Sequence, residues 1–209
     1  MRHILIFAVG RKVGGILFSK ATIQYCSAFK SRLNNVAIFC LELNMDHSAC
    51  FIGHRKIKDT PELRERVRRV VVDLIKNGTV NFLFGDNSEF NTLCYEIATE
   101  LKKEYPEIRR IKFRKDFEDA DEYTMRFLVS GYEDSICPEG VGKAGKASYV
   151  KRNEAMIRES EACIFYYDEN YKPARRKPVK NSMNGCQPKS GTALAYEYAI
   201  ARTKVINVF

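Results

Sequence analysis

Short apolar runs alternate with amphipathic segments from residue 49 to residue 208, and this alternation constrains the fold more than any other feature. The apolar runs are short enough for strands, and the segments between them repeat apolar residues at helical spacing. We predict strands at 49–52, 80–84, 108–113, 162–167 and 204–208, and helices at 60–77, 88–104, 149–160 and 193–202. Because strands that alternate with helices are joined by crossovers, we predict an α/β protein, a Rossmann-like three-layer fold with a mostly parallel central sheet flanked by helices.

The first predicted helix has clear signals at both ends. Thr60 is a preferred N-cap residue, Pro61 fits the first helical position, and Asn77-Gly78 is a typical end of a helix. By contrast, residues 114–148 show no helix or strand pattern. A stretch of this length is usually a functional or mobile loop.

Residues 1–44 differ from the rest of the chain, so we divide it into an N-terminal extension, 1–44, and a Rossmann-like domain, 45–209. The extension contains six basic residues and one acidic residue, and it shows no helix with clear caps. Three interpretations stay open. It is a targeting peptide, although the apolar run 4–9 is short for a secretory signal; it adds a strand at 36–43; or it results from an upstream start, with Met45 as the true initiator.

The formal net charge of +9 indicates an anionic partner, but the charge is unevenly distributed. Without the extension, a net charge of +4 is left for residues 45–209. This mild excess does not require binding to nucleic acid, which is therefore the weaker of the anionic partners. No apolar run approaches the roughly 18 residues of a membrane-spanning helix, so we expect no membrane partner.

The seven cysteines are odd in number, and no two have the C-x-x-C spacing. A disulfide framework and a metal site are therefore both poorly supported. Reduced, mostly buried thiols fit a reducing compartment, so we predict a cytoplasmic protein with no metal. The sequence has neither G-x-G-x-x-G nor G-x-x-x-x-G-K-[ST], which disfavours an NAD enzyme and a P-loop NTPase, and we expect no cofactor.

Three polar or glycine-rich segments fall where strands of a parallel sheet end or a helix begins. There, backbone N–H groups and helix N-termini can bind phosphate. The candidate ligand-binding segments are Gly53-His54-Arg55, Gly85-Asp86-Asn87 and Ser190-Gly191-Thr192. Each has a plainer interpretation: a turn glycine after the two strands, and an ordinary N-cap at Ser190. Their convergence on one edge of the sheet favours a site.

Arg152 and Asn153 lie in the first turns of the helix at 149–160 and complete the candidate site. An arginine can bind a phosphate through two parallel hydrogen bonds, although a solvated helix charge is the commoner role. His54 is a candidate hydrogen-bond donor or base, but a lone loop histidine is more often structural. A run of basic residues at 172–180 could bind a polyanion, or could form a solvated surface loop.

Together these motifs resemble the SLOG superfamily of Rossmann-like domains, named for Smf/DprA and LOG proteins, over about residues 50–209. The similarity is greatest to an uncharacterised bacterial branch whose first strand leads into G-H-R. It rests on the ordered set Phe51-Ile52-Gly53-His54-Arg55, Phe84-Gly85-Asp86, Lys151-Arg152-Asn153 with Met156, and Lys189-Ser190-Gly191-Thr192-Ala193. The resemblance implies a domain that binds nucleotides or their derivatives, sometimes as a sensor, and that commonly pairs into homodimers.

In LOG enzymes, the family's fold hydrolyses the N-glycosidic bond of a nucleoside monophosphate with an arginine and a glutamate. The family's R-x-x-x-M spacing is kept by Arg152 and Met156, so the resemblance implies that Arg152 is the arginine. The family's glutamate position is occupied by Ala195, and Glu197 lies two residues further on, about 200° around a helix. Whether the chain is an enzyme stays open.

Three functions follow. The first is binding or sensing of a nucleotide or nucleotide-derived phosphate ligand. The second is a nucleoside-monophosphate N-glycosidase or related transferase, with Arg152 and Glu197 as catalytic residues and with Asp86 or Glu89 as other candidate carboxylates. The third is a DprA-like DNA-binding protein that uses the basic loop at 172–180. We favour the first, because the matching glutamate is missing and the charge of the domain is low.

Overall fold

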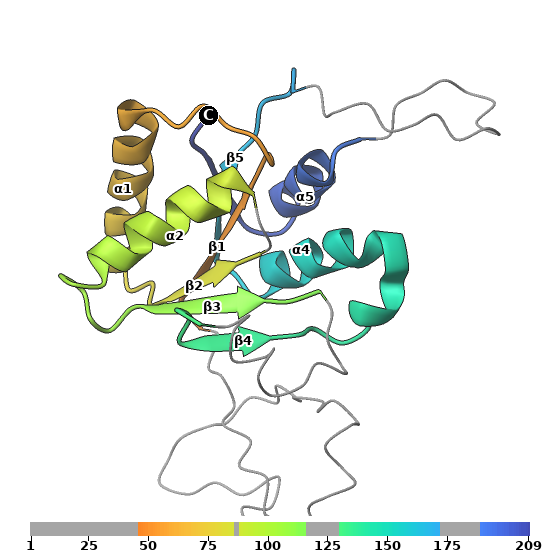
Figure 1. Cartoon of the computed structure of the whole chain (residues 1–209), viewed down its shortest axis with the longest axis horizontal. Helices are drawn as coiled ribbons and strands as arrows, with labels where there is room; N and C mark the ends of the chain where they lie inside the picture. Colours follow the sequence, from red (N-terminus) through yellow and green to blue (C-terminus); the bar gives the residue numbers. More distant parts are fainter. Residues whose placement is uncertain (1–45, 86–87, 116–129, 172–188) are drawn as a thin grey trace, which may run out of the picture. The chain divides into compact units, whose positions relative to one another are not determined.

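The computed structural model describes residues 46–85, 88–115, 130–171 and 189–209, and these residues form a six-stranded parallel sheet with helices on both faces (Figure 1). The predicted fold class is confirmed, and every strand pair in the described part is parallel. The strand order is β4-β3-β2-β1-β5-β6. The strands are β1 (Ser48–Gly53), β2 (Asn81–Phe84), β3 (Arg109–Phe113), β4 (Asp134–Ile136), β5 (Ala162–Tyr166) and β6 (Lys204–Asn207).

Helices α1 (Pro61–Lys76) and α2 (Glu89–Leu101) cover one face of the sheet, and α4 (Ser148–Arg158) and α5 (Gly191–Ile200) cover the other. The end signals of α1 act as predicted. The hydroxyl oxygen of Thr60 accepts the N–H of Leu63 at 3.2 Å, which caps the first turn. Gly78, with φ of +96°, donates its N–H to the carbonyl of Ile75 at 2.9 Å after the last turn.

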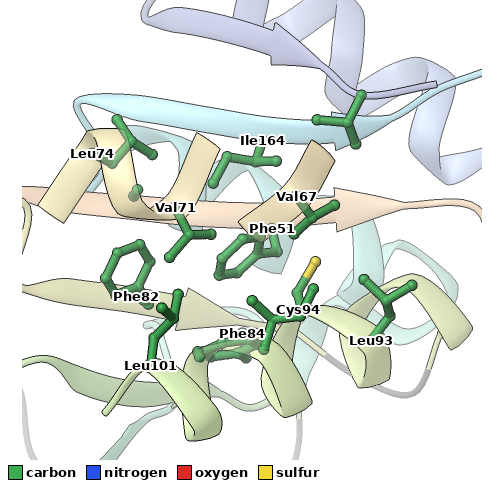
Figure 2. Close-up of a cluster of buried hydrophobic side chains, with 14 of the residues drawn as sticks. Phe51, Val67, Val71, Leu74, Phe82, Phe84, Leu93, Cys94, Leu101 and Ile164 are labelled. Carbon is green, nitrogen blue, oxygen red and sulfur yellow. The ribbon is translucent and has the colours of Figure 1, made fainter. Parts of the chain in front are cut away.

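Successive residues of each strand point to opposite faces of the sheet, and this divides the core into two clusters. Phe51, Phe82, Phe84 and Ile164 pack under α1 and α2 (Figure 2). Their immediate neighbours in the strands, which include Cys50, Leu83 and Cys163, pack under α4 and α5. The central strands β1, β2 and β5 are therefore buried on both faces, which explains why they appear in the sequence as continuous apolar runs rather than as alternating ones.

The stretch 114–148, predicted to be irregular, contains β4 and a 3-10 helix at Gly142–Ala147. The prediction missed β4 because this strand is an edge strand of three partly exposed residues, Asp-Ser-Ile, with no apolar run. It pairs with β3 in the register Ile111 to Asp134. The N-terminal extension, with its predicted strand at 36–43, lies outside the described residues, as do 116–129 and the basic loop at 172–180.

The order of the strands places a topological switch between β1 and β5. From β1 the chain moves through β2 to β3 on one side, whereas β5 lies on the other side of β1. In open parallel sheets, ligands bind beyond the carboxyl ends of the strands at such a switch. No helix of the described residues combines the length and the apolar character needed to cross a membrane.

Candidate functional site

The predicted binding segments that the structure describes lie at the carboxyl ends of neighbouring strands. Gly53 ends β1, Gly85 follows β2 directly, and Ser190 is the N-cap of α5. A hydrogen bond of 3.1 Å from the hydroxyl of Thr192 to the carbonyl of Gly53 ties the first turn of α5 to the end of β1. The structure thus brings Gly53 and Thr192 together. Asp86 and Asn87 lie outside the described residues.

Gly53 is required by packing. A Cβ atom built there would lie 2.6 Å from Cγ and 2.7 Å from Cβ of Phe90, a fully buried residue in the first turn of α2. The glycine therefore lets α2 approach the end of β1. This close approach gives Gly53 a role in the fold whether or not a ligand contacts it.

Gly85 makes room for the guanidinium of Arg152. A Cβ atom at Gly85 would lie 2.8 Å from Nη2 of Arg152. The backbone of Gly85 is also held on both sides. Its N–H donates to Oδ1 of Asn91 at 3.2 Å, and its carbonyl accepts from Nζ of Lys112 at 2.8 Å. The end of β2 is therefore fixed by α2 and β3 together.

Arg152 is buried, with 6% of its surface exposed, so it is not a solvated helix charge. Its Nη2 donates to Oδ1 of Asn153, also buried, at 2.9 Å. The guanidinium carbon lies 5.4 Å from the ring centroid of Tyr149, one helical turn earlier. These contacts hold a planar cation with several N–H donors beside the carboxyl end of β2.

The N-terminus of α5 combines a cap with an open glycine. Oγ of Ser190 accepts the N–H of Ala193 at 3.1 Å, so Ser190 is an N-cap in this structure. Gly191 is exposed, and a Cβ atom there would meet nothing within 4 Å. Packing among the described residues therefore does not require a glycine at position 191, in contrast to Gly53.

His54 is buried and joins the ends of β1 and β5. Its Nε2 lies 3.0 Å from the backbone N and 3.1 Å from the carbonyl O of Asp168, and the tautomer decides whether it accepts from the N–H or donates to the carbonyl. The ring of His54 stacks on Tyr171 with centroids 3.9 Å apart. Desolvation lowers the pKa of His54, against smaller opposing effects of the backbone and charge of Asp168. Nδ1 of the same ring is buried without a hydrogen-bond partner among the described residues.

Arg55 and two of the candidate carboxylates, Glu89 and Glu197, lie at the surface. Arg55 is exposed, and its carbonyl accepts the N–H of Glu89 at 3.0 Å. Glu89 accepts hydrogen bonds from Nζ of Lys56 and from the N–H of Ile57, and these lower its pKa in that order of effect. Glu197 accepts from Nζ of Lys189 at 2.6 Å.

The position that the family resemblance gives to a glutamate belongs to the core in this chain. Ala195 is 3% exposed and packs in the cluster under α4 and α5. Glu197, two residues later, is in an exposed ion pair with 53% of its side chain accessible. The structure shows no contact between Glu197 and Arg152 within the part of the chain that it describes.

Two functional candidates at this edge were missed by sequence analysis. Lys112, on β3, donates to the carbonyl of Gly85, and the ring of Tyr149 contacts the cations of Lys115 and Arg152. A lysine in an apolar strand could have signalled an edge position, but the partner strand is not visible in the sequence. Within the described ranges, no group of three or more histidine, cysteine, aspartate or glutamate residues could hold a metal ion.

The comparisons with known proteins include a distant structural neighbour. No family model matches the sequence, and no curated protein matches it. The chain resembles a solved structure of DNA processing protein A from Helicobacter pylori, described for its single-stranded DNA binding mode, with a TM-score of 0.43 and 18% sequence identity. The match covers 73% of this chain and 60% of that one. A match at this level carries no conclusion about function.

Proposed function

We propose that the carboxyl edge of β1 and β2, with the N-terminus of α5, binds a nucleotide or a nucleotide-derived phosphate ligand and acts as a binding or sensing module. The observation that supports this most is the buried guanidinium of Arg152, held where a side chain at Gly85 would stand. A planar guanidinium matches two oxygens of a phosphate, and burial strengthens such a pair. An arginine serving only for solubility would extend into water.

The N-terminus of α5 supplies the second half of the proposed site. Its first backbone N–H groups and the positive end of its dipole favour an anion. The absence of a side chain at Gly191 lets a phosphate approach the backbone, and the bond from Thr192 to Gly53 keeps this turn beside the end of β1. The ordered motifs by which the sequence resembles the SLOG superfamily support the same site. We assign Gly53, Gly85, Arg152 and Thr192 as its binding residues.

The test is a thermal-shift measurement on the full chain with nucleoside 5′-monophosphates, cyclic nucleotides and nucleotide sugars. A ligand at a hundredfold excess over its dissociation constant stabilises a specific site by about 2.7 kcal/mol. We expect a shift for the wild type and a much smaller one for Arg152→Gln. The matched control is Arg202→Gln, at an exposed arginine that lies 3.8 Å from the ring centroid of Tyr198.

The same samples separate the alternative functions. Chromatography after the measurement should recover the ligand intact, whereas release of free base would identify an N-glycosidase. Binding of oligonucleotides alone, with affinity that falls steeply with salt, would identify a DNA-binding protein. A shift that Arg152→Gln leaves unchanged, or no shift with any compound, contradicts the proposed site.

A further inference from the structure

Tyr149 is an exposed aromatic side chain beside the proposed phosphate site. It lies in the first turn of α4 with 42% of its surface accessible, three residues before the buried Arg152. Residues three apart on a helix share a face, so Tyr149 lies on the same face as Arg152, one turn closer to the N-terminus of α4. Because α4 runs toward the start of β5, its first turn lies at the carboxyl edge of the sheet (Figure 1).

Two cations contact the ring of Tyr149. Nζ of Lys115 donates to its hydroxyl at 2.7 Å and lies 4.4 Å from the ring centroid. The guanidinium carbon of Arg152 lies 5.4 Å from the same centroid. These contacts restrict the ring while leaving part of it accessible. A flat ligand that stacked there would therefore cost little side-chain entropy, because the tyrosine is already held in place.

We propose that Tyr149 stacks against the nucleobase of a ligand whose phosphate is bound beside Arg152. The inference rests on the proposed function and adds the class of ligand to it: a base-bearing nucleotide, not a sugar phosphate or inorganic phosphate. Aromatic rings accept every base, because every base has a π-face, whereas a bare sugar phosphate gains little from a tyrosine ring. The free nucleotide is the form to which we commit, since a single ring offers one stacking position.

A second tyrosine provides a matched control. Tyr198 lies in the last turn of α5, where the guanidinium carbon of Arg202 is 3.8 Å from its ring centroid. This pair has the same chemistry as that of Tyr149 with Arg152. However, α5 leads into β6, so its last turn lies at the amino ends of the strands, away from the proposed site.

The experiment is calorimetric titration of the full chain with the four nucleoside 5′-monophosphates and with ribose 5-phosphate. For the wild type we expect at least one nucleotide to bind roughly tenfold more tightly than ribose 5-phosphate. Tyr149→Ala should remove that difference by weakening nucleotide binding more than ribose 5-phosphate binding, which loses only the contact of Tyr149 with Arg152, and Tyr198→Ala should preserve the difference. Because Tyr149 is partly exposed, equal melting temperatures should show that the variant folds.

The outcomes separate this inference from the proposed function. If nucleotides and ribose 5-phosphate bind equally well, or if Tyr149→Ala weakens both equally, the stacking role is overturned while phosphate binding stands. If none of these compounds binds, the stacking role is overturned, and the proposed function falls with it only if the cyclic nucleotides and nucleotide sugars of the thermal-shift panel also fail to bind. A titration with oligothymidylates of increasing length distinguishes a free nucleotide from a nucleic acid. An affinity that rises with strand length and exceeds that of the mononucleotides would contradict our commitment to a free nucleotide.

Discussion

Burial of His54 makes the stability of the fold depend on pH. The pKa of His54 is lowered in the folded state, mainly by desolvation, so the unfolded chain takes up a proton at a higher pH than the folded chain does. The contribution of the neutral imidazole to the free energy of unfolding is therefore fully present above the pKa that His54 has in the unfolded chain. Its contribution is lost as the pH falls from there through the lowered folded pKa, where the unfolded state binds more protons.

We expect the free energy of unfolding to decrease between pH 7.5 and pH 5.5, as measured by urea denaturation. His54→Gln should make this decrease smaller, whatever its effect at a single pH. The matched control is His47→Gln, at an exposed histidine that lies 3.6 Å from a carboxylate oxygen of Glu161. Equal pH dependence in His54→Gln and the wild type would mean that His54 is not held neutral by burial.

The sequence predicted which residues lie at this edge of the sheet, but it did not predict which contacts they make. Gly53 and Gly85 follow apolar runs, so their position at strand ends could be predicted from the sequence. The burial of Arg152 could not, because it depends on α4 lying close to the end of β2, and no local pattern encodes that approach. Likewise, the hydrogen bond from Lys112 to Gly85 joins neighbouring strands.

At the scale of elements, the two site glycines should respond differently to alanine. Gly53→Ala places a methyl group against the buried Phe90, and overpacking of this kind costs typically about 1–3 kcal/mol. Gly191→Ala places it in open space at the first position of α5, so the free energy of unfolding should change by less than about 0.5 kcal/mol. Chemical denaturation of both variants measures the contrast.

Gly191→Ala, which should hardly change the free energy of unfolding, should have a clear effect on ligand binding. If phosphate approaches the backbone at the start of α5, Gly191→Ala should reduce nucleotide affinity although the fold is unaffected. Unchanged affinity in Gly191→Ala would place the phosphate elsewhere on the edge. A destabilisation as large as that of Gly53→Ala would mean that position 191 is packed.

Strands and helices were predictable where their burial or their ends produce a recognisable sequence pattern. The strands β1, β2 and β5 are buried on both faces and appear as apolar runs, and the caps at Thr60 and Asn77-Gly78 fix the ends of α1. The edge strand β4 has neither property. Its three residues are held by pairing with β3, a contact that depends on the folded sheet and not on local sequence.

At the scale of the molecule, strand order decides where chemistry can occur. At the switch between β1 and β5, Thr192 lies beside Gly53 although the two residues are 139 positions apart in the sequence. Alternation of strands and helices predicted a parallel sheet, but several strand orders satisfy that pattern. The pairing of β1 with both β2 and β5 is the information that only the structure supplies.

The measurement that tests the central claim most directly is amide NMR of the full chain titrated with the four nucleoside 5′-monophosphates. We expect at least one to shift the amide signals of Gly85 and Gly191–Ala193 and the side-chain Nε–H signal of Arg152, while signals of the amino ends of the strands stay in place. Shifts confined to another surface, or no shifts with any of the four at millimolar concentration, would contradict a nucleotide site at the carboxyl edge of this sheet.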